Sequence, residues 1–330
     1  VLTGNYSAEY GRTSGGVVNA ISKTGTNAFH GDLYEFLRND KLDANDFFLN
    51  SSGQARPAYR RNQFGVAAGG PIRKDRTFIF GDYEGIRQTQ GVAIPSIVPS
   101  DAARLGNLAD GSHVTVAPAI TRYLALYPHA NGPVKGDQGF FAFAGARVVS
   151  ENFYTVRGDH RISDKDSVFA TYMYDRAPYN QPDTFNNQNI LSSTIRHIAA
   201  LEESHIFSPN LVNNVRGGFN RNAVVNFLGI SAINPAVADP SLGVMPGANN
   251  PNTVIPGGFT ALPVGLFGNN TLHHWNSFQF YDDASLTRGS HSLKFGFAVE
   301  RMHYNFFSTF MRFGKLRFNS LKDFLVNNPS

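Results

Sequence analysis

The chain has 330 residues, of which 42% are hydrophobic, 13% aromatic and 16% charged, with a formal net charge of +4 and no cysteine. Soluble proteins usually carry about a quarter charged residues, so this charge content is low. Even so, the sequence has no run of about 18 apolar residues that would form a transmembrane helix. The mild, unclustered charge argues against a nucleic-acid partner, and the lack of cysteine excludes disulfide and thiolate chemistry. A transmembrane β-barrel and a large soluble β-sandwich both fit this composition.

The first informative stretch, residues 9–25, is rich in glycine. Gly11, Gly15 and Gly16 allow positive φ or a close approach of the backbone to another segment. Residues 17–21 are apolar and partly β-branched, and polar turn residues follow them, so they predict one short strand.

Further along the chain, alternation and β-propensity between turn residues predict nine strands. Their expected ranges are residues 29–38, 62–70, 77–88, 152–162, 167–176, 195–207, 211–222, 278–287 and 292–304. In the clearest case Tyr154 and Val156 fall on one face and Arg157 and Asp159 on the other. Short helices are predicted at 100–108, 118–127 and 319–327 from their N-cap residues or an early proline.

The connections between these strands alternate between short and long. Brief turns are expected at 71–76, 163–166, 208–210 and 288–291, a medium loop rich in Asn, Pro and Gln at 177–194, and two long irregular stretches at about 89–150 and 223–277. Outer-membrane barrels have short turns at one rim and longer loops at the other, whereas a soluble sandwich has no reason to segregate them. Strands of about ten residues are also long enough to cross a membrane at a tilt.

The order Tyr-Gly, Gly-Gly-Val-Val-Asn and Lys-x-Gly within residues 9–25 resembles the closing segment of the plug domain of TonB-dependent outer-membrane receptors. Residues 29–36, FHGDLYEF, resemble the first barrel strand of that family. The continuation Arg38-Asn39-Asp40 with residues 42–48, LDANDFF, is similar to the Oar-like branch. The resemblance extends at intervals to about residue 305.

This resemblance implies an all-β fold: an antiparallel transmembrane β-barrel preceded by the C-terminal tail of a plug domain. The chain would supply about nine strands of a barrel type that has about 22. Residues 1–27 would form the end of the plug, and residues 28–330 the N-terminal part of the barrel, with short helices in extracellular loops at about 89–150 and 223–277. The sequence shows neither a signal peptide nor a closing aromatic strand, so we expect a fragment of a longer protein.

The implied function is TonB-dependent uptake of a scarce or bulky nutrient across the outer membrane of a Gram-negative-type bacterium. The implied partners are outer-membrane lipid, the TonB–ExbB–ExbD complex acting through an upstream region, and an unknown small-molecule, glycan or peptide substrate. Residues that connect plug and barrel would take part in gating: Glu9, Tyr10, Gly11, Arg12, Gly15 and Gly16. The alternatives are an outer-membrane adhesion or structural barrel without active transport, and a soluble carbohydrate-binding or hydrolytic β-protein.

Two further sets of residues are expected on the barrel wall. Polar residues facing the lumen would contact the plug or the substrate, or simply line a wet interior: Asp82, Glu84, Arg157, Asp159, Arg161, Asn214, Arg216, Asn220, Lys294 and Glu300. Aromatic residues near strand ends would form an interfacial girdle, although ordinary sheet packing would also use them: Tyr172, Tyr174, Tyr281 and Tyr304.

The sequence offers little sign of catalytic or metal-binding chemistry. The sequence has no Gly-x-Ser-x-Gly elbow, His-Glu-x-x-His pair, Walker loop or dinucleotide fingerprint, so we expect no enzyme activity and no cofactor. His273 and His274 are adjacent on the chain and cannot both face one metal from a strand, and nearby residues complete no tetrahedral set. We therefore expect no metal site.

Overall fold

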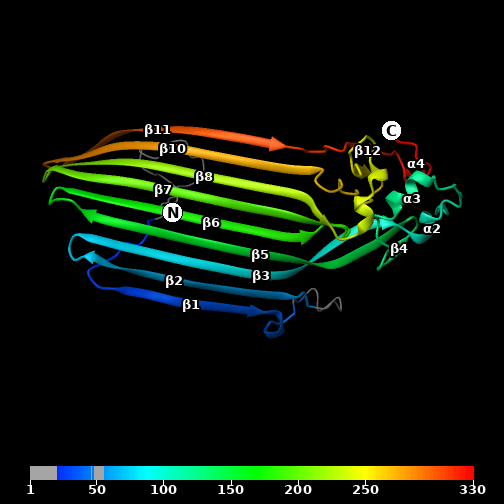
Figure 1. Ribbon diagram of the computed structural model, residues 1–330, viewed down its shortest axis with the longest axis horizontal. Coiled ribbons are helices and arrows are strands. Elements are labelled where there is room, and N and C mark those ends of the chain that lie inside the picture. Colours follow the sequence, from blue (N-terminus) through cyan, green and yellow to red (C-terminus); the bar gives the residue numbers. More distant parts are fainter. Residues whose placement is uncertain (1–20, 46, 48–55) are drawn as a thin grey trace.

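The computed structural model describes residues 21–330 except 46 and 48–55, and it forms one large antiparallel sheet (Figure 1). Nine long strands follow one another in chain order, each paired with the next. These strands are β1 (His30–Asn39), β2 (Tyr59–Arg73), β3 (Thr77–Pro99), β5 (Gln138–Arg161), β6 (Asp166–Pro182), β7 (Gln188–Ser208), β8 (Leu211–Ala232), β10 (Asn269–Arg288) and β11 (His291–Ser308). All nine strands expected from the sequence are present, so the predicted all-β antiparallel fold is confirmed.

Among the described residues, no helix has both the length and the apolar character needed to cross a membrane.

The connections between strands differ strongly at the two ends of the sheet. Four brief turns, 74–76, 162–165, 209–210 and 289–290, lie together at what we call the turn end. The connections 100–137, 183–187 and 233–268 lie at the opposite, loop end, where β1 also ends and β2 begins (Figure 1). The two long connections expected from the sequence therefore lie at one end of the sheet and the brief turns at the other. The medium loop expected at 177–194 is reduced to residues 183–187, because β6 and β7 extend into it.

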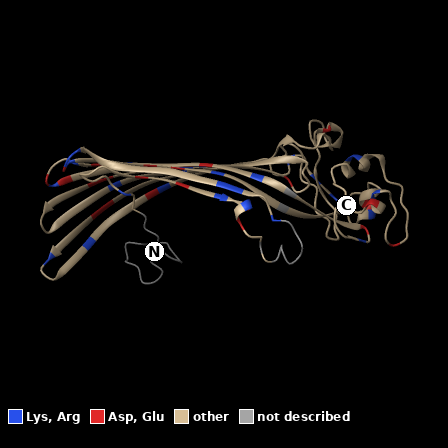
Figure 2. Cartoon of the chain, turned by 90° about the horizontal axis from the view of Figure 1, so that it is seen from below, with Lys and Arg blue, Asp and Glu red and all other residues tan. Residues whose placement is uncertain are grey.

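The strand register assigns every long strand two faces, because directly paired residues point to the same side of a sheet. We define the inner face as the one that carries Arg157 and Asp159, and the other as the outer face. The segment 21–29 runs across the inner face at the turn end, where Ser22 and Thr24 contact those two side chains. Figure 2 shows the sheet as a single curved layer.

The outer face carries a broad band of exposed apolar side chains. Each of the following residues of this band is more than a third exposed: Val66, Ile79, Val156, Leu201, Phe278, Phe280, Phe295, Phe297 and Val299. Monomeric soluble proteins rarely expose a continuous apolar surface of this extent, whereas a membrane barrel needs one.

Three pairs of strands are longer than the sequence predicted, and the extra residues all lie at the loop end. Residues 89–99 and 138–150, expected to be irregular, form a continuous hairpin of β3 with β5. Phe140, Phe141 and Phe143 occupy both faces of this extension, so the period-two pattern that marks a half-buried strand is lost. Residues 223–232 with 269–277, and residues 177–182 with 188–194, also form strand extensions at the loop end. The sequence predicts loops there because these segments contain Pro or Asn residues.

The long connections at the loop end fold together into one compact body, which we call the cap. It contains α2 (Asp101–Arg104), α3 (Pro118–Leu124), β4 (Val134–Lys135), the 3-10 turns η2 (Pro235–Ala238) and η3 (Pro240–Leu242), β9 (Asn252–Val254), β12 (Lys315–Arg317) and α4 (Leu321–Leu325). A short 3-10 turn, η1 (Asp40–Leu42), follows β1 outside the cap.

A single apolar cluster joins segments of the cap that are far apart in sequence. Ile120 and Leu124 of α3, Leu262 of the β8–β10 connection, and Phe318 and Phe324 after β11 are all buried in it. Backbone hydrogen bonds add to this packing: the Ala117 N–H donates to the Leu325 carbonyl and the Phe318 N–H to the Val254 carbonyl. The three predicted short helices are confirmed, and Ser100 and Ser320 cap α2 and α4.

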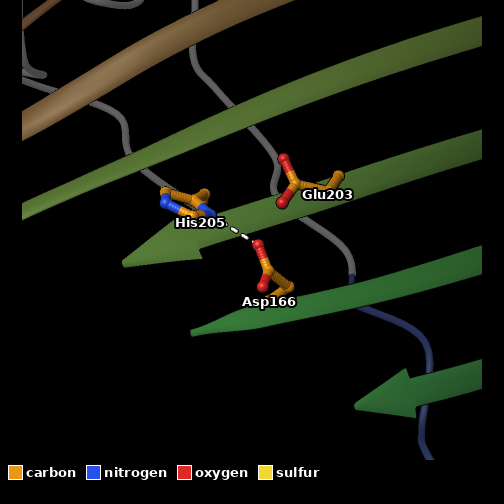
Figure 3. Close-up of side chains that lie close together, drawn as sticks. All are labelled: Asp166, Glu203 and His205. Carbon is orange, nitrogen blue, oxygen red and sulfur yellow. Dashed lines mark hydrogen bonds and ion pairs between the residues drawn. The ribbon is translucent and has the colours of Figure 1, made fainter. Parts of the chain in front are cut away.

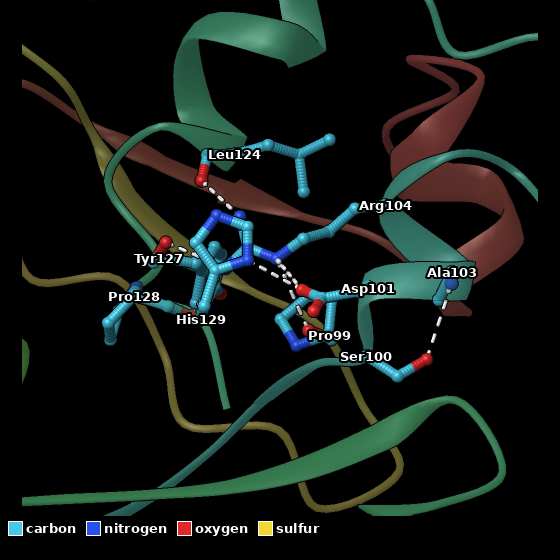
Figure 4. A network of polar contacts seen from close by, with 9 residues as sticks. All are labelled: Pro99, Ser100, Asp101, Ala103, Arg104, Leu124, Tyr127, Pro128 and His129. Carbon is cyan, nitrogen blue, oxygen red and sulfur yellow. Dashed lines mark hydrogen bonds and ion pairs between the residues drawn. The ribbon is translucent and has the colours of Figure 1, made fainter. Parts of the chain in front are cut away.

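The guanidinium of Arg104 holds the cap together from inside (Figure 4). It donates to the carbonyls of Leu124 at 2.9 Å, Tyr127 at 2.7 Å and Pro128 at 2.5 Å, and more weakly to Pro99 at 3.3 Å. Burial lowers the pKa of Arg104 and raises that of the Tyr127 hydroxyl. One side chain thus binds carbonyls at and just beyond the C-terminus of α3.

Candidate functional site

The inner face near the turn end binds the segment 21–29 through a partly buried ion pair. Arg157 Nη2 lies 2.7 Å from Asp159 Oδ1, and the guanidinium stacks 4.1 Å from the centre of the Phe169 ring. Arg157 Nη1 also donates to Ser22 Oγ at 3.1 Å, and Thr24 Oγ1 donates to Asp159 Oδ2 at 2.7 Å. Each charged group therefore holds one residue of the segment while neutralising its partner.

Glycine at position 25 allows this segment to lie flat on the wall. A Cβ built on Gly25 would be 2.6 Å from the Ile79 carbonyl oxygen and 2.8 Å from that of Gly70, closer than side chains tolerate. Two residues later, Asn27 is bonded to the β2–β3 turn, where the Asp75 N–H donates to Asn27 Oδ1 at 2.8 Å. The segment is thus fixed at two points before β1 begins.

Further polar pairs line the inner face across the whole sheet. Glu84 accepts from Tyr34 Oη at 2.7 Å and from Gln63 Nε2 at 2.8 Å, which links β1, β2 and β3. Arg216 pairs with Glu202, and Arg196 Nη1 lies 3.5 Å from Asp175 Oδ2.

The same pattern continues over β8, β10 and β11. Asp283 accepts from Asn214 at 3.3 Å and lies 3.7 Å from Lys294 Nζ. Glu300 accepts from Ser277 Oγ at 2.6 Å and from Gln279 Nε2 at 3.0 Å.

Most of the polar wall residues expected from the sequence lie on one face of the sheet. The register puts nine of the ten on the inner face together: Asp82, Glu84, Arg157, Asp159, Asn214, Arg216, Asn220, Lys294 and Glu300. Arg161 has the same parity but lies at the β5–β6 turn, where its Nη2 is 3.0 Å from Asp164 Oδ1. Their role as plug or substrate contacts stays a prediction, and the junction residues Glu9, Tyr10, Gly11, Arg12, Gly15 and Gly16 lie outside the described residues.

The four tyrosines expected in one girdle are divided between the two faces. Tyr172 and Tyr174 lie on the outer face. Tyr281 is paired with Arg216, and Tyr304 with Trp275, so both lie on the inner face and cannot belong to a lipid-facing girdle. The expectation fails for these two because a position near a strand end does not reveal which face a residue occupies.

The structure shows instead a longer aromatic row on the outer face that the sequence reasoning did not find. Ring centres are 6.2 Å apart for Phe64 and Tyr83, 5.0 Å for Tyr154 and Tyr174, and 5.1 Å for Tyr174 and His197. Farther along, Phe219, Phe278 and His303 continue it. The sequence did contain this information, because these aromatic residues are an even number of positions away from the apolar outer-face residues of their strands.

On the inner face, a second aromatic group lies toward the loop end. The His273 ring nitrogen Nδ1 and Tyr304 Oη are 2.7 Å apart, and the Trp275 and Phe306 rings flank them. His273 was considered above as part of an irregular loop, but it belongs to β10 and is paired with Phe306.

One group of potential metal ligands lies at the turn end of the outer face (Figure 3). Ligand atoms of Asp166, Glu203 and His205 lie within 4.8 Å of one another. Asp166 and His205 are directly paired across β6 and β7, and His205 Nδ1 is 2.5 Å from Asp166 Oδ1. This hydrogen bond accounts for the close approach of the side chains without a bound ion.

An open antiparallel sheet with an apolar outer face, a polar inner face and segregated loops defines a membrane β-barrel wall. Residues 21–330 match the family described as "Outer membrane beta barrel domain", and the chain belongs to that family. It is therefore a protein of the bacterial outer membrane.

Individual relatives agree with this placement. The chain is 32% identical over 87 residues to the TonB-dependent transporter Oar of Myxococcus xanthus, an alignment that covers 25% of this chain and 8% of Oar. This match confirms the expected resemblance to TonB-dependent proteins of the Oar type.

Solved structures of the ferric-catecholate import receptor Fiu from Escherichia coli are also similar. The closed form has a TM-score of 0.49 and 15% identity over 93% of this chain and 46% of Fiu. The open form has a TM-score of 0.46 and 14% identity over 87% of this chain and 42% of Fiu. The chain thus spans less than half the length of Fiu and a small fraction of Oar.

Proposed function

We propose that this protein is a TonB-dependent outer-membrane importer and that residues 21–29 tether its plug to the barrel wall. The supporting observation is that this segment makes two hydrogen bonds to the Arg157–Asp159 pair, one to each residue. A barrel that serves only as a membrane anchor needs no segment that crosses its inner wall and is held there by a partly buried ion pair. Membership of the outer-membrane barrel family and the similarity to a TonB-dependent transporter support the same function.

In this proposal residues 1–27 end the plug and residues 28–330 begin the barrel. The turn end faces the periplasm, and the cap faces the outside. A nutrient binds near the loop end, and the TonB–ExbB–ExbD complex, energised by the proton gradient of the inner membrane, pulls on a region upstream of this sequence. The plug then rearranges and the nutrient passes along the inner face. The residues expected to transmit this movement remain Glu9, Tyr10, Gly11, Arg12, Gly15 and Gly16.

The inner-face ion pairs suit this role because their charges are already neutralised within the wall. A plug that slides past such a wall exchanges weak, partly hydrated polar contacts and breaks few strong ones. The Arg157–Asp159 pair differs because it is largely buried and holds the tether, so it keeps the end of the plug in place while the rest moves.

The test is growth of the native host, deleted for this gene, on a panel of defined nutrients. We expect the restored gene to support growth on at least one scarce iron chelate, cofactor, glycan or peptide, and only in cells that contain TonB. In-cell cross-linking should also join the protein to TonB. If the restored gene gives the same phenotype with and without TonB, the protein acts as an adhesion or structural barrel and the import proposal is wrong.

A further inference from the structure

An arginine recurs at one position in each strand that leaves a short turn. It is the eleventh residue of β3, β6, β8 and β11, whose first residues are Thr77, Asp166, Leu211 and His291. The four residues, which we call the arginine row, are Arg87, Arg176, Arg221 and Arg301. Each belongs to the outer face, since the register pairs or aligns it with residues of that face.

Equal spacing from the turns puts the arginine row at one height on the barrel. Ten steps of about 3.3 Å along a strand tilted by about 40° rise about 25 Å above the turns, which is the height of the apolar band of an outer-membrane barrel. The row therefore lies where the band ends toward the loops.

The residues beneath each arginine agree with this height. Two or four positions closer to the turn, the outer face carries Tyr83 below Arg87, Tyr174 below Arg176, Phe219 below Arg221 and Val299 below Arg301. Three of these belong to the aromatic row, and aromatic side chains of this kind mark the membrane interface. An arginine just beyond them extends its apolar stem over the band and its guanidinium into the headgroup layer.

Neighbouring strands position two of these guanidiniums without neutralising them. Arg87 Nη2 donates to Asn152 Oδ1 at 2.8 Å, and Arg221 Nη1 donates to Asn276 Oδ1 at 3.2 Å. Arg87 also stacks over Phe64, with 5.6 Å between Cζ and the ring centre. These partners are neutral amides and a ring, so the positive charge is retained.

The contrast with the inner face is clear. There Arg157, Arg196 and Arg216 each have a carboxylate partner. Within the part of the chain that the structure describes, no member of the arginine row has a carboxylate within 4.0 Å. Four aligned charges without internal counter-ions require anions from the surroundings.

We propose that the arginine row binds the phosphate groups of anionic lipid in the leaflet on the loop side. Arginine suits phosphate because its planar fork offers two parallel hydrogen bonds. Successive members are two strands apart, which corresponds to about 12 Å around a barrel with about 4.8 Å between strands at this tilt. This spacing favours a headgroup with two phosphates, each held by one arginine.

The experiment measures lipid binding by the full protein in discs of zwitterionic phosphatidylcholine. The probe is a fluorescent bisphosphorylated glycolipid, with the chemically dephosphorylated glycolipid and phosphatidylglycerol in parallel. A quadruple variant replaces Arg87, Arg176, Arg221 and Arg301 by Gln. A matched control replaces four exposed arginines outside the row, Arg73, Arg122, Arg288 and Arg317, so both variants lose the same charge.

We expect the row variant to bind the bisphosphorylated glycolipid roughly 30-fold more weakly, at about fivefold for each of two headgroup contacts, while the control stays within about threefold of the native protein. Affinity should also fall steeply with salt. Equal binding by native protein and row variant, or an equal loss in the control, overturns the proposal.

Two further measurements guard against misfolding of the variant. Replacing the four arginines by Lys keeps the charge and should restore part of the affinity, because the ammonium lacks the paired hydrogen bonds of the guanidinium. Independently, the unaltered native protein should prefer the phosphorylated glycolipid to its dephosphorylated form by a similar factor; no preference overturns the proposal without any variant. Preference for phosphatidylglycerol over the glycolipid would refute the two-phosphate headgroup.

Discussion

Replacing Arg104 by Ala should loosen the whole cap while leaving the sheet intact. The side chain is only 11% exposed and donates four hydrogen bonds to backbone carbonyls. A hydrogen bond from a charged donor contributes about 1.5–3 kcal/mol, but the Pro99 contact is long and some carbonyls will be rehydrated, so we expect a total loss of about 3–5 kcal/mol. Arg104→Lys should lie between the native protein and Ala, because one ammonium cannot reach all four oxygens.

Hydrogen–deuterium exchange of the protein in bilayer discs measures this loss locally. The amides of Ala117 and Phe318 report on the cap because each donates across two loop-end segments. At about tenfold per 1.4 kcal/mol, their protection should fall by roughly 100- to 3,000-fold, while amides in the middle of β6 and β7 stay unchanged. The control is Arg122→Ala, an exposed arginine on α3.

Protection of Ala117 and Phe318 that drops by less than about threefold in Arg104→Ala would refute the reasoning. It would mean that the apolar cluster alone stabilises the cap and that water can replace Arg104 as hydrogen-bond donor to the four carbonyls at no cost. A large drop in Arg122→Ala would refute it as well, because charge and not the buried contacts would then decide cap stability.

Three other predictions concern single sites. Gly25→Ala should destabilise the tether by about 1–3 kcal/mol, since its Cβ meets the Ile79 carbonyl, and limited proteolysis near residue 25 should become faster; unchanged cleavage would contradict the flat approach. Asp159→Asn should release the tether more than Arg161→Gln does, as read by the rate of limited proteolysis near residue 25, and equal effects would argue against the Arg157–Asp159 anchor. Burial raises the pKa of the Asp183 carboxyl in the β6–β7 connection, so its contribution to stability is full below the unfolded pKa and is lost as the pH rises through the folded pKa. Asp183→Asn should therefore remove this pH dependence from the hydrogen–deuterium exchange of loop-end amides. An unchanged pH profile in the variant would contradict a role for Asp183.

Much of the sheet could be predicted from sequence because membrane strands alternate strictly where one face meets lipid and the other meets polar groups. That is why the strands predicted at 152–162 and 292–304 have nearly correct boundaries at the turn end, where β5 ends at Arg161 and β11 begins at His291. The loop-end extensions could not be found in this way. There Phe140, Phe141 and Phe143 lie on both faces of a hairpin that continues into the cap, so the lipid no longer dictates the pattern.

The candidate site was predictable from the sequence wherever alternation along a single strand was enough to group residues on one face. Within one strand, alternation correctly grouped Arg157 with Asp159 and Asn214 with Arg216. Assigning Tyr281 and Tyr304 to a face required the register with neighbouring strands, which the sequence does not contain. The tether contacts of Ser22 and Thr24 were also beyond prediction, because they join residues about 135 positions apart.

The shared interior of the cap has a practical consequence for recognition by antibodies and for protein engineering. Because Ile120, Leu262 and Phe324 lie in one cluster, no single surface segment keeps its shape when removed from the others. Synthetic peptides copied from one connection should therefore raise sera that do not bind the folded protein. Likewise, exchanging one connection between homologous proteins should succeed only when its two companions are exchanged with it.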